Sequence, residues 1–158
     1  MYVRRAVQHL VEPLVVSWGY DAEKPSASRF IDEQEWNGTR DIAAYLAVPE
    51  AIRFCEENHW DAVRAQCHAL AQTARRQITA LTGLPPLSPD APEWYGQMVT
   101  LPLPPCDTAQ LKTRLYDAYR IEVPILTWRN QPHIRVSVQA YNTRDDVTRL
   151  VEALQSLL

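Results

Sequence analysis

Two short segments of this chain combine residue types that can bind an anionic ligand, and the first spans residues 35–41 with the sequence EWNGTRD. Gly38 lets the backbone approach a ligand closely, because glycine carries no β-carbon. Thr39 offers a hydroxyl just before an expected helix over residues 40–47, where free N–H groups form an anion site. A local role for Thr39 as the cap of that helix explains the same residues, and from spacing alone both possibilities remain open.

The second segment spans residues 134–143 with the sequence IRVSVQAYNT. Its apolar residues alternate with Arg135, Ser137 and Gln139, which is the pattern of a half-buried strand over residues 134–140. Arg135 is therefore expected on the polar face, where a guanidinium can hold a carboxylate through two parallel hydrogen bonds. A solvated strand arginine, or a salt bridge within the protein, is the alternative for this residue.

In this order and at this spacing, the two segments resemble the C-terminal part of the class V aminotransferases, which are pyridoxal 5'-phosphate (PLP) enzymes of fold type I. The isopenicillin N epimerase-like branch of that family is the most similar, and the resemblance covers essentially the whole chain. It implies a fold between α/β and α+β. Residues 1–58 would be the end of the large PLP-binding domain, including the Gly-Thr-Arg-Asp interface segment. Residues 59–158 would be a long connecting helix and a small α+β domain with a mostly antiparallel sheet.

The resemblance also implies roles for individual residues of the two segments. In the family, the threonine that matches Thr39, beside the glycine that matches Gly38, reaches the PLP phosphate of the other subunit, which implies a homodimer. The arginine that matches Arg135 binds the α-carboxylate of the amino-acid substrate. Arg40 is a candidate for a second substrate carboxylate, with pairing to Asp41 or to a neighbouring subunit as the alternative.

The lysine content separates this chain from a complete enzyme of that family. Family members attach PLP as a Schiff base to a lysine of the large domain, whereas the only lysines here are Lys24 and Lys112. Neither has a matching context, so no catalytic residue is expected in this chain, and the chain alone is expected to bind no PLP covalently and to be inactive. The resemblance places Met1 just past the reactive lysine.

Two classes of function follow from these expectations. In the first, the chain is part of an enzyme that epimerises or transaminates an amino acid, with PLP as the electron sink. In the second, it is a non-catalytic remnant or an assembly domain. One half of a split enzyme, working with a complementary N-terminal half, is a related possibility.

Charge, cysteines and histidines exclude several other classes of function. A net charge of −3 gives no reason to expect nucleic acid or a membrane surface as partner. No apolar run reaches the ~18 residues of a membrane span, and no signal peptide is evident, so a cytoplasmic location is expected. The histidines have no metal-ligand spacing, and His68 is expected to be solvated.

The three cysteines indicate neither a disulfide framework nor a zinc site. Cys55 and Cys67 fall on apolar helical positions and are expected in the core. Cysteine desulfurases of the same class carry a catalytic cysteine on the loop that matches residues 127–132. This chain has none there, and Cys106 lies well upstream, so a persulfide-forming role is disfavoured.

Hydrophobic periodicity predicts the elements that position these residues. The longest is a helix over residues 60–81, stopped by Gly83 and followed by an extended linker over 84–95. Asn142 suits a turn, and Thr143 is expected to cap the last helix. Residues 1–35 are not expected to bury a core of their own. The other expected elements are strands over 14–17, 98–101 and 121–126, the last with Pro124 at a sheet edge, a polar loop over 21–28, and helices over 50–57 and 108–119.

Overall fold

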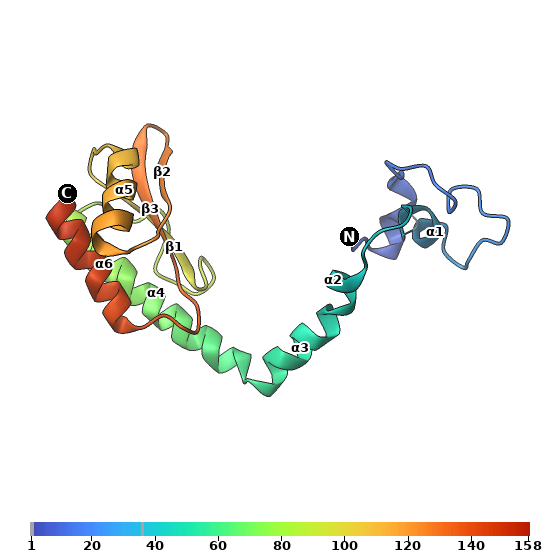
Figure 1. The fold of residues 1–158 in the computed structure, drawn as a ribbon, viewed down its shortest axis with the longest axis horizontal. Helices are drawn as coiled ribbons and strands as arrows, with labels where there is room; N and C mark the ends of the chain where they lie inside the picture. The colour runs from blue at the N-terminus through green and yellow to red at the C-terminus, as the bar shows by residue number, and fades with distance from the viewer. Residues whose placement is uncertain (1, 36) are drawn as a thin grey trace. The chain divides into compact units, whose positions relative to one another are not determined.

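The computed structural model describes residues 2–35 and 37–158, so Met1 and Trp36 lie outside the described residues. The chain divides into two compact units, Met1–Phe54 and Cys55–Leu158. In chain order, the elements are η1 (Arg5–Leu10), α1 (Arg29–Glu35), α2 (Ala43–Leu46), α3 (Val48–Glu57), α4 (Trp60–Thr82), β1 (Met98–Pro102), α5 (Thr108–Tyr119), β2 (Ile125–Trp128), β3 (Gln131–Ser137) and α6 (Arg144–Leu157) (Figure 1).

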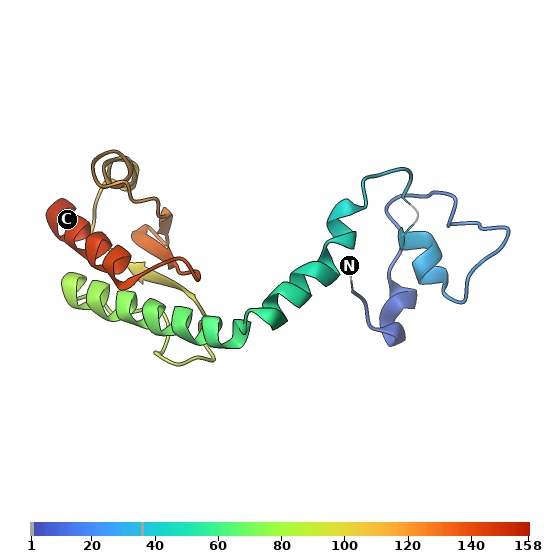
Figure 2. The same ribbon diagram turned by 60° about the horizontal axis from the view of Figure 1, so that its bottom comes forward.

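The second unit is an antiparallel sheet covered on one face by helices. Its strand order is β1-β3-β2, and β3 pairs antiparallel with both neighbours. Helices α4 and α6 run side by side in both views (Figures 1 and 2). This arrangement confirms the predicted small α+β layer with a mostly antiparallel sheet. The fully buried side chains of the core come from both layers: Ile78, Leu101, Leu103, Leu115, Ile134 and Leu154.

Helix α4 has the predicted apolar period and ends at Gly83, as the sequence predicted. Cys67, Ala71, Ala74 and Ile78 are buried at spacings of three and four, which confirms the apolar stripe. Gly83 ends the helix in the left-handed conformation with φ 67° and donates its N–H to the carbonyl of Thr79. A residue with a β-carbon would be strained in this conformation, which explains the stop.

The two strands of the hairpin, β2 and β3, have other bounds than the sequence predicted. β2 covers Ile125–Trp128 instead of residues 121–126, because Pro124 has no N–H with which to extend the ladder. Its carbonyl still accepts from the N–H of Arg135, at the edge of the sheet as predicted. The strand then continues to a two-residue turn, Arg129–Asn130, with φ 50° and 61°. β3 is accordingly Gln131–Ser137 rather than 134–140, with its alternation as predicted.

Side chains cap the last two helices at their N-terminal ends. The Thr143 hydroxyl accepts from the N–H of Asp146, and the Asp146 carboxylate accepts from the N–H of Thr143, so the predicted cap of α6 is confirmed as a capping box. At α5, the carboxylate of Asp107 accepts from the N–H groups of Ala109 and Gln110. Hydrogen bonding to Thr143 holds the pKa of the Asp146 carboxyl below its usual value.

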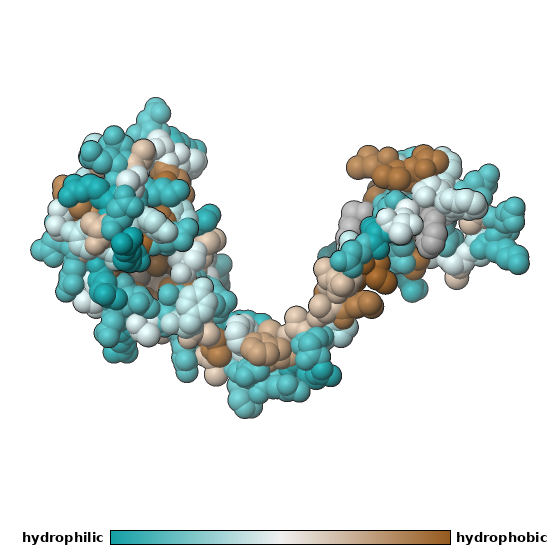
Figure 3. Space-filling model, in the orientation of Figure 1, coloured by the Kyte–Doolittle hydropathy of each residue, from teal (hydrophilic) through white to brown (hydrophobic). Residues whose placement is uncertain are grey.

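The first unit buries almost no apolar side chain. Among its described residues only Glu33 is buried, while Leu14, Val16 and Trp18 are largely exposed. The predicted strand over 14–17 is wrong, because a strand needs a partner and this segment has none among the described residues. Figure 3 shows apolar side chains gathered on the visible surface of this unit.

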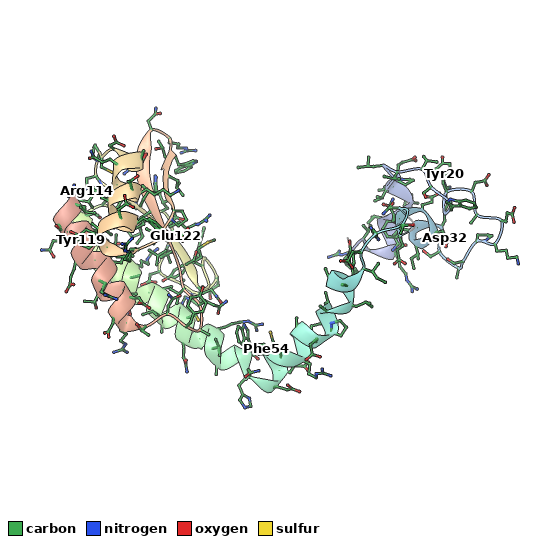
Figure 4. All side chains as sticks on the ribbon, in the orientation of Figure 1. Tyr20, Asp32, Phe54, Arg114, Tyr119 and Glu122 are labelled. Atoms are coloured by element: carbon green, nitrogen blue, oxygen red, sulfur yellow. The ribbon has the colours of Figure 1, made fainter. Side chains whose placement is uncertain are left out.

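Local contacts within the first unit involve both its backbone and its side chains. The chain around Gly19 passes so close to the carbonyl of Asp32 that a β-carbon at position 19 would overlap it. Figure 4 labels Asp32 and, next to Gly19 in the chain, Tyr20. The expected helix over 40–47 is shorter, since α2 begins at Ala43 and its first turn is held by the carboxylate of Asp41.

Candidate functional site

Arg135 lies on the face of the sheet opposite the helices. Its strand neighbours Ile134 and Val136 are buried in the core, whereas Arg135 and Ser137 are exposed. β3 is the middle strand, so Arg135 is flanked by Thr100 of β1 on one side and by Pro124 on the other. The alternation of the sequence therefore predicted the side of the sheet correctly.

The guanidinium of Arg135 has no ion-pair partner among the described residues. The alternative role of Arg135, a salt bridge within the protein, is therefore not found in the described part of the chain. An exposed guanidinium at the centre of a sheet face can bind a carboxylate by donating two hydrogen bonds in its own plane.

Gly38, Thr39 and Arg40 lie in the first unit, along a hollow of about 1010 Å³ between α1 and α2. Gly38 has φ 95°, and no described residue beyond its chain neighbours lies within 4 Å of the place where a β-carbon would be. The interpretation of Thr39 as a helix cap is wrong: Ile42 occupies the N-cap position of α2, and the carboxylate of Asp41, not the hydroxyl of Thr39, accepts from the N–H of Ala43. The hydroxyl of Thr39 is exposed, with no hydrogen-bond partner among the described residues.

These residues fit a phosphate in part. The Thr39 hydroxyl can donate a hydrogen bond to a phosphate oxygen. The absence of a β-carbon at Gly38 lets that oxygen approach the backbone closely. The expected helix start does not contribute, because the four-residue α2 begins only at Ala43. Arg40 lines the hollow as well, but so do the acidic side chains of Asp32 and Glu35, which oppose the binding of an anion.

Arg40 is engaged within its own unit. Its Nη2 donates to the carbonyl of Glu35 at 3.2 Å, and its guanidinium lies 5.2 Å from the ring centroid of Tyr45. The expected alternative of pairing with Asp41 is wrong, because the Asp41 carboxylate accepts instead from the N–H of Ala43.

Sequence reasoning missed a polar cluster around Asp90, which holds the 84–95 linker against α4. Arg75 of α4 is only 6% exposed; it donates to the carbonyl of Ser88, and its Nε lies 3.8 Å from Asp90. The hydroxyl of Tyr95 also donates to Asp90, as does Gln72 at 3.3 Å. No spacing rule signals this cluster, because it forms only when the linker folds back.

The titration of this cluster follows from its contacts. The hydrogen bond from Tyr95 holds the pKa of the Asp90 carboxyl below its usual value. Burial, followed by the hydrogen bond to Asp90, raises the pKa of the Tyr95 phenol.

Two expectations about histidine and cysteine are corrected nearby. His68 is not simply solvated: its Nδ1 donates to the carbonyl of Gly96 at 2.8 Å, and its ring lies 5.0 Å from that of Tyr95. Cys67 is buried as predicted, whereas Cys55 is only half-buried.

His133 is a second missed residue, 1% exposed on β3. Its Nδ1 donates to the carbonyl of Gln131 at 2.8 Å, and the ring meets Trp128 edge-on. Its Nε2 is buried and has no hydrogen-bond partner among the residues that the structure describes.

A separate cavity of about 430 Å³ lies in the second unit between the end of α5, the end of β3 and the start of α6. Tyr119 and Glu122, labelled in Figure 4, belong to its wall. Its lining combines apolar side chains such as Val136 and Leu150 with charged residues of both signs, Arg120 and Arg149 against Glu122 and Asp146. Arg135 does not line it.

Within residues 2–35 and 37–158, no three histidine, cysteine or acidic side chains gather as a metal site. None of the helices in this part of the chain is both long and apolar enough to cross a membrane.

Known proteins with similar sequences extend these observations. Isopenicillin N epimerase of Amycolatopsis lactamdurans is 40% identical over 94% of this chain, and that of Streptomyces clavuligerus is 37% identical over 93%. A probable L-cysteine desulfhydrase of Arabidopsis thaliana is 29% identical over 80% of the chain. The chain spans about 40% of the length of either epimerase and 30% of the desulfhydrase.

The sequence profile of the class V aminotransferases matches residues 1–150. This family depends on PLP, as the resemblance implied. With the small α+β domain and nearly the whole chain matched, the protein belongs to the class V aminotransferase family.

Proposed function

We propose that this chain forms the C-terminal part of a PLP-dependent enzyme that epimerises or transaminates an amino acid. The observation that carries the proposal is Arg135, an exposed arginine at the centre of a helix-free sheet face, without an ion-pair partner in the described chain. Such a group suits the α-carboxylate of a substrate, because its planar fork matches the two carboxylate oxygens.

Gly38 and Thr39 are proposed to contact the phosphate of the cofactor. Their exposure and open backbone support this role. Since the matching family residues act across a subunit boundary, we propose a homodimer. Arg40 is the weaker candidate for a second substrate carboxylate, because two of its contacts already lie within its own unit.

PLP, when bound, supplies an electron sink that makes the α-hydrogen of an amino acid labile. The proposed contribution of this chain is to orient the substrate through Arg135 and the phosphate through Thr39. Lys24 and Lys112 are both exposed and belong to neither group of residues, so the cofactor-attaching lysine is proposed to lie outside this chain. Alone, the chain would then be inactive.

A large domain that carries the PLP-binding lysine is the partner that this proposal requires. The exposed apolar side chains of the first unit support one, because an unpartnered apolar surface of this extent is unusual on a monomer. The same surface is also the observation that favours the alternative, a non-catalytic assembly domain. Whether the partner brings a lysine decides between the two.

The proposal is tested with a hybrid in which the part of the Amycolatopsis lactamdurans epimerase that this chain does not span is fused before the chain. The hybrid should bind PLP and exchange the α-hydrogen of an amino-acid substrate with deuterium. Arg135→Lys should cost about 2–4 kcal/mol of transition-state stabilisation while PLP still binds. Arg114→Lys, an exposed arginine on α5, is the matched control and should change nothing.

Normal turnover in the Arg135→Lys hybrid would exclude the substrate-binding role. A hybrid that folds but binds no PLP would instead favour the assembly domain.

A further inference from the structure

We infer that Thr100 is a second binding residue for the carboxylate assigned to Arg135, which makes this inference rest on the proposed function. Thr100 lies on β1, directly opposite Arg135 in the strand register. Nothing in the two sequence segments pointed to it, since it lies 35 positions before Arg135 along the chain.

The hydrogen-bond pattern of the sheet determines how close the two side chains are. The N–H of Val138 donates to the carbonyl of Gln97, so hydrogen-bonded pairs between β1 and β3 recur at every second residue from there. The pair of Thr100 and Arg135 falls between them, and the N–H of Arg135 is directed to Pro124 on the β2 side. Opposed residues of such non-hydrogen-bonded pairs have Cα atoms about 4.5 Å apart and the closest side chains in a sheet.

Both side chains lie on the same, helix-free face. Thr100 is half-buried, and its neighbours Val99 and Leu101 are in the core, as Ile134 and Val136 are beside Arg135. The hydroxyl of Thr100 has no partner among the described residues. A β-branched side chain has few rotamers, so the hydroxyl is held in place before any ligand arrives.

The chemistry of the pair suits one carboxylate. Arg135 can donate two parallel hydrogen bonds in the plane of the carboxylate, and the Thr100 hydroxyl can donate a third to a remaining lone pair. The other side chains across from this position offer no competing hydroxyl, since Pro124 flanks Arg135 on the opposite edge. Ser137 lies on the same face but one strand repeat further along β3.

The experiment is an NMR titration of the full 158-residue chain with L-alanine, and with L-alaninamide as the probe that lacks a carboxylate. Signals of the Arg135 guanidinium and of the Thr100 backbone should shift with L-alanine only. Thr100→Val keeps the shape and branching but removes the hydroxyl, and should weaken the apparent affinity roughly fivefold to tenfold. Arg135→Lys should abolish the shifts. Thr113→Val, an exposed threonine on α5, should bind like the unsubstituted chain.

Unchanged affinity in Thr100→Val, with loss in Arg135→Lys, would overturn the role of Thr100 and leave the proposed function standing. Shifts that persist in Arg135→Lys, equal shifts with L-alaninamide, or no shifts in any variant would overturn both.

Discussion

The guanidinium carbon of Arg75 lies 5.4 Å from the ring centroid of Tyr95, and both side chains contact the same carboxylate, that of Asp90. This contact joins a buried position of α4 to the end of the linker that precedes β1. It fixes a proline-rich segment that has no regular secondary structure of its own. The linker is therefore part of the folded second unit.

Replacing Arg75 by methionine should destabilise the chain by about 1–3 kcal/mol, mainly because the carbonyl of Ser88 loses its donor. The ion pair contributes less, since Asp90 is 38% exposed and solvent screens it. Urea unfolding measures the difference. Arg76→Met, exposed on the same helix, is the control and should stay within about 0.5 kcal/mol of the unsubstituted chain. Equal effects of the two substitutions would contradict the cluster.

Acid should weaken the second unit in part through Asp90. Its folded-state pKa is depressed, so its contribution is present above the unfolded value and is lost as the pH falls through the lower folded value. Tyr95→Phe removes the main cause of the depression. The melting temperature of this variant should therefore fall less steeply below roughly pH 4 than that of the unsubstituted chain. Asp146 titrates in the same direction in both proteins, so parallel curves would show that Asp90 plays no part.

Two threonines that precede helices in the sequence should respond differently to alanine. Thr143→Ala removes one half of a capping box and should cost about 1 kcal/mol of stability. Thr39→Ala should leave stability unchanged, because the Thr39 hydroxyl caps nothing. Thermal unfolding of the two variants gives the comparison. A comparable loss in Thr39→Ala would restore the helix-cap interpretation.

The purified chain should form no stoichiometric covalent adduct with PLP. Both lysines are exposed, and no site described here surrounds either of them. Absorption spectra after mixing, followed by borohydride reduction and mass spectrometry, test this. A single reduced adduct that disappears in Lys24→Arg or Lys112→Arg would show that this chain carries an attachment lysine after all.

Limited proteolysis should cut the first unit before the second. The described residues of the first unit bury no apolar side chain, whereas the second unit encloses a core between sheet and helices. The earliest cleavage is expected within residues 2–35, and fragments beginning near residue 55 should persist. Early cuts inside residues 63–81 of α4 would reverse this order of stability.

Local patterns in the sequence were sufficient for the helices and the first strand of the second unit, and for the side of the sheet on which Arg135 lies. Helix α4 could be predicted because its apolar period and the stop at Gly83 are both local signals. The capping box at Thr143 is local as well. The family followed from two continuous segments, and the matched relatives bear it out.

Tertiary structure alone decided which polar residues are buried and where strands pair. Arg75 and His68 occupy polar positions in the period of α4, yet a linker that folds back gives them partners. β2 begins later in the sequence than predicted, at Ile125, because pairing depends on which N–H groups face β3, and Pro124 has no N–H. The run at 14–17 has the composition of a strand but no strand to pair with in the described part of its unit. Hydrogen-bond partners distant in sequence, which no local period encodes, account for each of these differences.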